Sequence, residues 1–249
     1  MNVLITGATA GFGLAMARRF IQDGARVIAT GRRTERLEAL RAELGERVLP
    51  LTLDITDREA VERTVRSLPA EFADVDVLVN NAGLALGLDP AQSARLEDWD
   101  TMVDTNVKGL LYCTHAVLPG MVARNRGHVI NMGSVAAEWP YPGGNVYGAT
   151  KAFVHQFSLN LRADLHGTAV RVTDIEPGLV GGTEFSSVRF KGDDTRAASV
   201  YANTQALTPE DIADAVHWVA TRPAHVNINV MSLMPVSQSF GPLPVKRQG

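Results

Sequence analysis

Three polar side chains near the middle of the chain have the types and the spacing of an acid–base catalyst. Tyr147 and Lys151 are four residues apart, so on a helix they project from the same face. A phenol ordinarily loses its proton at about pH 10, and a fixed ammonium group one turn away favours the phenolate and lowers that pKa. Ser134 adds a hydroxyl that can donate to a carbonyl oxygen or accept from an alcohol. The Tyr–Lys spacing alone also fits an ordinary surface helix, so the surrounding elements must decide.

A glycine-rich turn follows directly on an apolar run at the start of the chain. Residues 3–6 predict a buried strand, and an apolar helix continues from Gly13 until it ends near Gly24. In such a turn, backbone N–H groups lie at the positive end of the helix dipole, where a pyrophosphate binds. The glycine spacing differs from Gly-x-Gly-x-x-Gly, but the strand–turn–helix order is the one that this fingerprint requires. A glycine-rich loop without a ligand is the alternative.

The second predicted strand, residues 26–30, ends in two arginines rather than a carboxylate. Folds that bind NAD usually place an acidic residue about 20 residues beyond the glycine turn, where it holds the ribose 2′-hydroxyl. Arg32 and Arg33 stand here instead, and the planar guanidinium group makes charge-assisted bonds to phosphate oxygens. The alternative is a solvated basic turn. The position after this strand favours NADP(H) as the cofactor.

The rest of the chain alternates apolar runs with amphipathic segments. This pattern predicts a Rossmann-type doubly wound parallel sheet of about seven strands, with helices on both faces. The further strands are expected at residues 48–53, 75–79, 128–132, 169–175 and 230–234. The further helices are expected from Thr34 as a cap, from Asp57 as a cap, at about 97–123, at about 147–166 and from Pro209. Residues 179–206 show no clear period and predict a substrate lid.

Composition places the chain in a broad class. With 249 residues, 45% of them hydrophobic, it suits a single α/β domain over residues 1–249. The formal net charge of -3 argues against nucleic-acid binding, and we expect neither a leader peptide nor a membrane span. The single cysteine, Cys113, fits a reducing cytoplasm. The six histidines and Cys113 lack the spacing of metal ligands, so no metal site is expected.

Taken together, the motifs resemble the short-chain dehydrogenase/reductase family. They occur in the family's order along the whole chain: the glycine turn at 6–13, Asn-Asn-Ala-Gly at 80–83, Asn106, Ser134, Tyr147-x-x-x-Lys151 and Pro177-Gly178. The longer runs at 145–154, 174–185 and 188–193 resemble members of the family that use NADP to oxidise small 3-hydroxy acids. The resemblance implies hydride transfer between the nicotinamide and the 3-hydroxyl carbon of serine, allo-threonine or the 3-hydroxypropionate/malonic semialdehyde pair.

The same resemblance implies the roles of the catalytic residues. Tyr147 would be the general acid in reduction and the general base in oxidation, and it would contact the substrate together with Ser134. Lys151 would hold the nicotinamide ribose hydroxyls and lower the pKa of Tyr147. Ser134 would orient the reacting oxygen and stabilise charge on it. Asn106 would hold a water that links Lys151 to solvent, although a helix-interior amide bonded to its own backbone is the alternative.

The cofactor site is implied residue by residue. The expected contacts are Gly7, Ala8, Thr9, Ala10, Gly11 and Phe12 around the pyrophosphate; Arg32 and Arg33 on the 2′-phosphate; Asp54 and Ile55 at the adenine; Asn81 and Gly83 along the ribose, with Tyr147 and Lys151; and Pro177, Gly178, Leu179, Val180, Gly181, Gly182, Thr183, Glu184 and Phe185 over the nicotinamide. Asp54 could equally be a turn residue at the end of its strand.

The substrate's carboxylate needs a cation, and the lid offers two, Arg189 and Lys191. Arg189 is the expected ligand, although solvated lid charges are the alternative. A reductase of larger carbonyls, such as 3-oxoacyl groups or cyclic ketones, is a second possible function. A non-catalytic NADP-binding regulator is a third, but such a protein is expected to lack Ser134, Tyr147 or Lys151. The resemblance also implies a homotetramer.

Overall fold

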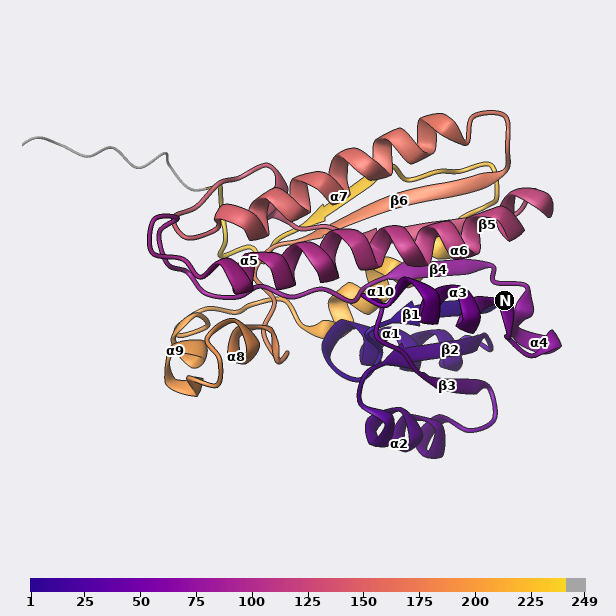
Figure 1. Ribbon diagram of the computed structural model, residues 1–249, viewed down its shortest axis with the longest axis horizontal. Helices are drawn as coiled ribbons and strands as arrows, with labels where there is room; N and C mark the ends of the chain where they lie inside the picture. Colours follow the sequence, from indigo (N-terminus) through magenta and orange to yellow (C-terminus); the bar gives the residue numbers. More distant parts are fainter. Residues whose placement is uncertain (241–249) are drawn as a thin grey trace, which may run out of the picture.

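A parallel sheet forms the centre of the protein (Figure 1). The computed structural model describes residues 1–240, and the seven strands follow the order β3-β2-β1-β4-β5-β6-β7. Every neighbouring pair is parallel, which confirms the predicted fold class. The strands are β1 (Asn2–Thr6), β2 (Arg26–Gly31), β3 (Val48–Thr52), β4 (Val77–Asn80), β5 (Gly127–Met132), β6 (Val170–Pro177) and β7 (Val230–Leu233).

The strand order changes direction between β1 and β4. The chain first builds β1, β2 and β3 outward, then returns to place β4 on the other side of β1. In open α/β sheets the crevice at such a switch point, beyond the carboxyl ends of the strands, is where ligands bind. The loops that begin at Gly7 and Asn81 therefore face each other at this edge.

Helices cover both faces of the sheet because their apolar sides need burial. One face packs against α1 (Gly11–Gln22), α2 (Thr34–Leu44) and α10 (Pro209–Ala220), with Phe20 and Ile212 fully buried between the layers. The other face packs against α6 (Leu110–Ala123) and α7 (Asn145–Asp164), which Figure 1 shows side by side in front of the sheet. The remaining short elements are α3 (Arg58–Arg66), α4 (Ala70–Ala73), α5 (Leu96–Val103), η1 (Asp104–Gly109), η2 (Val135–Ala137), α8 (Phe185–Arg189) and α9 (Asp194–Ser199).

The helix expected at about 97–123 is continuous but contains one irregular turn, so that it is divided into α5, η1 and α6. Between α5 and α6 the chain forms a π turn, η1, and Asn106 lies within that turn with 2% of its surface exposed. π turns are rare and occur frequently at functional sites, because the wider turn redirects the side chains that it carries. Hydrophobic periodicity does not reveal this turn.

Local capping signals mark the starts of α3 and α10. Asp57 caps α3 as predicted, its carboxylate accepting from the Ala60 N–H, and Thr208 forms a capping box at the start of α10. Thr34 is not the cap of α2, contrary to expectation: the cap position is Arg33, and the Thr34 hydroxyl lies 2.7 Å from that of Thr52. The helix thus begins at Thr34, one residue earlier than expected.

Two segments at the carboxyl edge differ from the prediction. Strand β6 extends to Pro177, so Glu176 and Pro177 lie within the strand, beyond its expected end at residue 175. Residues 179–206, predicted without regular structure, include α8 and α9, which Figure 1 shows in orange beside the sheet's carboxyl edge. None of the helices within residues 1–240 has the length and apolar character needed to cross a membrane. Residues 241–249 of the predicted domain lie outside the described residues.

Candidate active site

The four predicted catalytic residues meet beyond the carboxyl ends of β4 and β5. Tyr147 and Lys151 come from one face of α7, Ser134 follows β5, and Asn106 comes from η1. Each is buried, with at most 9% of its surface exposed. The Lys151 ammonium lies 5.8 Å from the centre of the Tyr147 ring. The structure therefore brings together residues that are 45 positions apart in the chain, counted from Asn106 to Lys151.

Lys151 is held in place by the backbone. Its Nζ donates a 2.7 Å hydrogen bond to the Met132 carbonyl at the end of β5. Burial lowers the pKa of Lys151 to about 8, and the nearby carboxylate of Asp174 opposes that shift. The ammonium has two further protons with which to contact a bound molecule.

Tyr147 is more difficult to ionise than a free phenol. Burial raises its pKa to about 12, whereas the nearby Ser134 hydroxyl and the charge of Arg189 lower it by less. The sequence led us to expect a pKa lowered by Lys151, and in this structure burial outweighs the neighbouring charges. The Ser134 hydroxyl accepts from the Ala136 N–H at 3.1 Å and donates to the Pro177 carbonyl at 3.4 Å.

Asn106 joins two segments rather than its own helix. Its Oδ1 accepts from the Leu84 N–H at 2.9 Å, and its Nδ2 donates to the Leu84 carbonyl at 2.8 Å and to the Thr150 hydroxyl at 3.1 Å. The alternative of an amide bonded to its own helix backbone does not fit these contacts. Gly83 lies within the same group, since a Cβ at this position would stand 3.2 Å from Asn106 Oδ1 and 3.6 Å from Lys151 Nζ.

The glycine turn leaves room and donors for a phosphate. Gly7 has φ +69°, a conformation that L side chains rarely adopt, and a Cβ on Gly13 would lie 2.3 Å from the Gly7 carbonyl oxygen. Ala10, at the cap of α1, offers no side-chain acceptor, and the first turn carries no acidic residue. Asn81 supports the turn from β4, its amide donating to the Thr6 carbonyl at 2.8 Å. The first N–H groups of α1 are thus free to bind an anion.

The predicted 2′-phosphate site contains a network of charges. Arg33 donates to the Thr9 hydroxyl at 2.9 and 3.2 Å and pairs with Glu184 at 2.8 Å. Glu184, predicted over the nicotinamide, places its carboxylate between Arg33 and Arg36, 2.8 Å from each. Arg32 is exposed. Because Glu184 belongs to the lid segment, these ion pairs tie the start of the lid to α2.

The predicted adenine contacts lie next to this network, at the end of β3. Asp54 Oδ1 accepts from the N–H of Thr56 at 3.0 Å and from its hydroxyl at 2.8 Å, which is the arrangement of a turn residue. Ile55 is buried and fits against Gly109, where a Cβ would lie 2.6 Å from Ile55 Cδ1.

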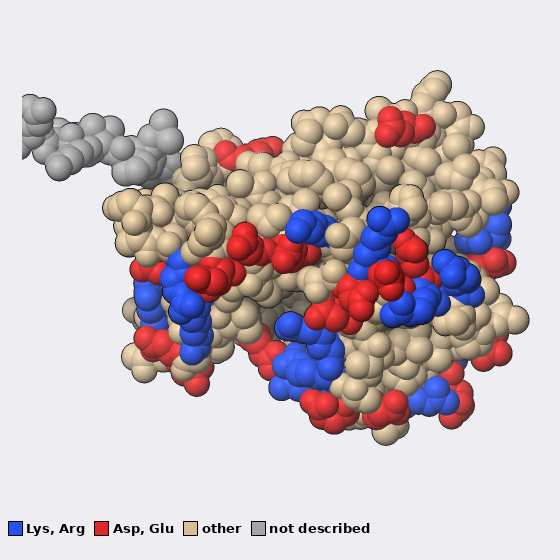
Figure 2. Space-filling view, in the orientation of Figure 1, with Lys and Arg blue, Asp and Glu red and all other residues tan. Residues whose placement is uncertain are grey.

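The segment from Pro177 to Phe185 leads from the end of β6 into the lid. The Gly178 N–H donates to the Leu233 carbonyl at 2.7 Å, and Val180 forms a parallel bridge with Leu207. Its last residue, Phe185, packs edge-on against Tyr147, with ring centres 5.7 Å apart. Figure 2 shows a hollow in this face of the molecule, with both basic and acidic side chains around it.

Arg189 lies over the catalytic tyrosine. Its guanidinium carbon is 5.3 Å from the centre of the Tyr147 ring and 5.5 Å from that of Phe185. One Nη donates to the Tyr141 hydroxyl, whereas its buried Nε has no hydrogen-bond partner within residues 1–240. Lys191, the other lid cation, points away and pairs with Asp98 at 2.7 Å. Only Arg189 of the two lies beside the predicted catalytic group.

Sequence reasoning missed three residues of this site. Tyr141 positions Arg189, Thr150 accepts from Asn106, and Arg36 shares Glu184 with Arg33. Arg36 is three residues after Arg33, and on a helix this spacing places the two side chains next to each other. The sequence could therefore have indicated Arg36. Tyr141 and Thr150 act across segments that only the fold brings together, so the sequence carried no signal for them.

Comparison with known proteins agrees with this geometry. The family described as short chain dehydrogenase matches residues 1–194. The NADP-dependent 3-hydroxy acid dehydrogenase YdfG of Salmonella typhimurium is 71% identical over 247 residues, which are 99% of this chain and 100% of that protein. The serine 3-dehydrogenase of Agrobacterium fabrum is 55% identical over 99% of this chain and 98% of its own length. The closed form of serine dehydrogenase complexed with NADP+ is 67% identical, with a TM-score of 0.99 and full coverage of both chains. With matches along its whole length and this arrangement of Ser134, Tyr147 and Lys151, the chain belongs to the short-chain dehydrogenase/reductase family.

Proposed function

We infer that this protein is an NADP-dependent oxidoreductase that acts on small 3-hydroxy acids such as serine. The observation that carries this function is similarity over the full length: 71% identity to a 3-hydroxy acid dehydrogenase, and a TM-score of 0.99 with a serine dehydrogenase bound to NADP+. The residues of the site fit this activity independently, because they supply a proton donor, a hydride-transfer cofactor site and a cation for a carboxylate.

NADP fits the cradle at the carboxyl edge of the sheet. The Gly7–Phe12 turn and the uncapped start of α1 would hold the pyrophosphate, and the fork of Arg33 would hold the 2′-phosphate. We propose that the adenine lies against Asp54 and Ile55. When bound, the nicotinamide supplies the hydride acceptor or donor and, in its oxidised form, a positive charge.

The chain's own residues move and hold the proton. Tyr147 would take the proton of the substrate hydroxyl in oxidation and return it in reduction. Ser134, whose hydroxyl lies near Tyr147 and lowers its pKa, would hold the substrate oxygen in the same place in both directions. Lys151 would bind the ribose hydroxyls with the ammonium protons that Met132 leaves free. Asn106 would fix the loop at Leu84 and a water on the route to solvent.

Arg189 supplies the selectivity for acids. Its guanidinium group lies over Tyr147, and its unpartnered Nε is a donor that a substrate carboxylate could satisfy. In a 3-hydroxy acid, a few bonds separate the hydroxyl from the carboxylate. This separation suits Tyr147 as proton acceptor and Arg189 as cation, since the guanidinium carbon lies 5.3 Å from the centre of the Tyr147 ring. A large neutral ketone would leave the buried Nε of Arg189 without an acceptor.

We also propose a homotetramer in the cytoplasm, built from one catalytic domain per subunit with residues 179–206 as its lid. The supporting feature is the outer side of α7, where Phe153 is 37% exposed and stacks on Phe157. Figure 2 shows few charged side chains over this helix, in its upper part. Light scattering of the purified protein measures the assembly directly.

A substrate panel tests the function. Purified protein is mixed with NADP+ and L-serine, L-allo-threonine or 3-hydroxypropionate, beside a neutral secondary alcohol and a cyclic alcohol. We expect NADPH to form with the three acids and little with the neutral alcohols. Turnover restricted to neutral alcohols would instead support a reductase of larger carbonyls. Binding of NADP(H) without turnover of any compound would support a non-catalytic regulator.

A further inference from the structure

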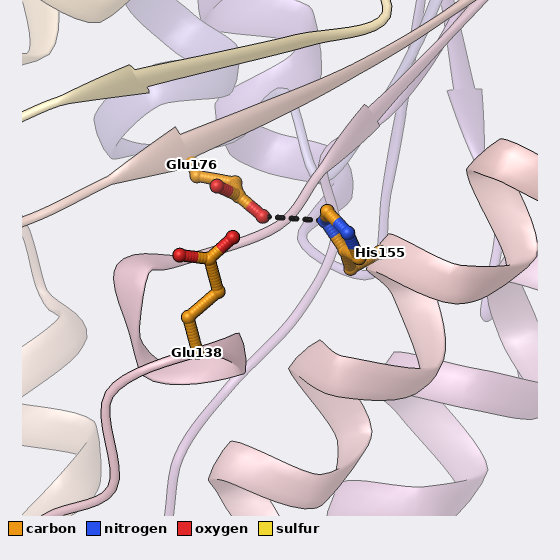
Figure 3. A group of neighbouring side chains, drawn as sticks. All are labelled: Glu138, His155 and Glu176. Atoms are coloured by element: carbon orange, nitrogen blue, oxygen red, sulfur yellow. Dashed lines mark hydrogen bonds and ion pairs between the residues drawn. The ribbon is translucent and has the colours of Figure 1, made fainter.

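A second group of ionisable side chains lies near the catalytic lysine, and Figure 3 shows three of its members, Glu138, His155 and Glu176. His155 projects from α7, Asp174 and Glu176 from β6, and Glu138 follows η2. Asp174 and Glu176 are two positions apart on a strand, so both face α7. His155 Nδ1 lies 2.8 Å from Glu176 Oε1 and 3.3 Å from Asp174 Oδ2. No role in hydride transfer requires these four residues.

The buried carboxylates lack the partners that such groups normally have. Asp174 is fully buried, and neither of its oxygens accepts a hydrogen bond from any group within residues 1–240. Glu176 is 2% exposed, and its hydrogen bond to the single ring of His155 leaves most of its acceptor capacity unused. Two carboxylates side by side in the interior repel each other unless one of them binds a proton or a cation lies between them.

One imidazole cannot satisfy this group. Nδ1 faces both Asp174 and Glu176, and a single ring nitrogen can donate to one of them at most through a straight bond. Glu138 adds a third carboxylate from the exposed side. The ligand atoms of Glu138, His155 and Glu176 all lie within 4.8 Å of one another. Figure 3 shows the carboxylates of Glu138 and Glu176 turned toward each other, with the His155 ring beside Glu176.

These distances suit a metal ion of the first transition row. Bonds of about 2.0–2.2 Å from such an ion to nitrogen and oxygen place neighbouring ligand atoms about 3–3.5 Å apart. The 2.8 and 3.3 Å separations around Nδ1 need to change by only a few tenths of an ångström. Glu138 is exposed and could close the coordination sphere after the ion enters from solvent. One imidazole with carboxylates suits Mn²⁺ or Zn²⁺ better than Mg²⁺, which prefers oxygen ligands and water.

We propose that Glu138, His155, Asp174 and Glu176 form a binding site for a divalent first-row transition cation, and that the site binds Mn²⁺ and Zn²⁺. The ion would satisfy the buried oxygens of Asp174 and would fix α7 to β6 and to the segment after η2. It would lie apart from the reacting atoms, so it brings no new bond-making step.

Titration of the full chain with Mn²⁺ tests the site. Protein freed of metals with a chelator is titrated at pH 8, without NADP or substrate, and free Mn²⁺ is followed by its electron paramagnetic resonance signal. We expect one equivalent to bind with saturation, Zn²⁺ to displace it and excess Mg²⁺ to leave it in place. His155→Gln should weaken binding on the order of 100-fold, since it removes the only nitrogen ligand. Because turnover is not measured, this result is separate from the proposed function.

Two variants guard against misfolding and non-specific binding. Glu138→Gln changes an exposed side chain and should weaken Mn²⁺ binding about tenfold without affecting the fold. His166→Gln, which changes an exposed histidine beyond the end of α7, should bind like the parent. The proposal is overturned by the absence of saturable one-to-one binding. It is equally overturned if His155→Gln and Glu138→Gln bind like the parent, or if His166→Gln loses binding to the same extent.

Discussion

Replacement of Arg189 by alanine should separate acids from neutral alcohols. The guanidinium group lies 5.3 Å from the centre of the Tyr147 ring, and its buried Nε has no partner within residues 1–240. A hydrogen bond between charged groups stabilises a complex by about 1.5–3 kcal/mol. At about 1.4 kcal/mol per tenfold change, its loss lowers kcat/KM for L-serine by about 10- to 150-fold.

A neutral secondary alcohol has no carboxylate to lose, so only indirect effects remain for it. Arg189 also lowers the pKa of Tyr147, and its removal should slow proton transfer for every substrate alike. That shared loss should be only a few-fold, because burial, not Arg189, is the largest influence on this pKa. The measurement is initial NADPH formation over a range of concentrations of each substrate, for parent and variant.

Lys191→Ala is the matched control. This side chain is a lid cation two positions away, 46% exposed, and it pairs with Asp98 rather than with the site. Exposed ion pairs contribute about 0–1 kcal/mol, so kcat/KM for L-serine should fall by less than about fivefold. Tyr141→Phe, which removes the acceptor that orients Arg189, should give an intermediate loss for the acid alone. Equal fold losses for acid and neutral alcohol in Arg189→Ala would refute the assignment.

Three further predictions concern the proton and the cofactor. Tyr147→Phe should reduce turnover by at least about 10²–10⁴-fold while the affinity for NADP(H), measured by fluorescence titration, changes little; near-normal turnover would remove the acid–base role. Arg32→Ala combined with Arg33→Ala should weaken NADP(H) by about 10- to 100-fold and NAD(H) hardly at all; an unchanged preference would place the phosphate elsewhere. Because burial raises the pKa of Tyr147 from 10.0 to about 12, its contribution to stability is complete below pH 10 and is lost as the pH rises through 12. The ultraviolet difference spectrum of parent minus Tyr147→Phe at pH 10.5 should therefore show no tyrosinate, and a full tyrosinate band would contradict the raised pKa.

The sequence predicted the sheet because its signals are local. Short apolar runs bounded by turns mark buried strands, and alternation with amphipathic segments implies parallel pairing. Asp57 and Thr208 marked helix starts for the same reason, since a cap bonds within three residues. Ser134, Tyr147 and Lys151 could be placed at one edge because parallel strands and their loops share that edge.

The features that the sequence did not reveal depend on distant segments. Glu184 forms ion pairs with Arg33 and Arg36, which are about 150 positions away in the chain, and no local pattern predicts that pairing. Asn106, within the π turn, bonds to Leu84 and Thr150, which are 22 and 44 positions away, and no local pattern predicts those bonds. The pKa of Tyr147 was expected to fall, because spacing shows a neighbouring charge but not the degree of burial.

The proposed metal site escaped sequence reasoning for a similar reason. Its ligands come from three segments, and none of them has the His-x-x-x-His or Cys-x-x-Cys spacing that marks a local metal motif. The site can be recognised only when the burial of its carboxylates is known. A fully buried Asp174 with unpartnered oxygens requires an explanation that an exposed aspartate does not.

The charges around Lys151 connect the two sites. Burial lowers the pKa of Lys151 to about 8, and burial together with the charge of Glu176 raises the pKa of Asp174 to about 7. Tyr147, with a pKa of about 12, keeps its proton over this range. In the protein alone, the pKa values of Lys151 and Asp174 are therefore shifted toward neutrality, whereas that of the catalytic phenol is shifted away from it. Because the charge of Asp174 raises the pKa of Lys151, any group that changes that charge also shifts the pKa of Lys151 at the active site, although it never contacts the substrate.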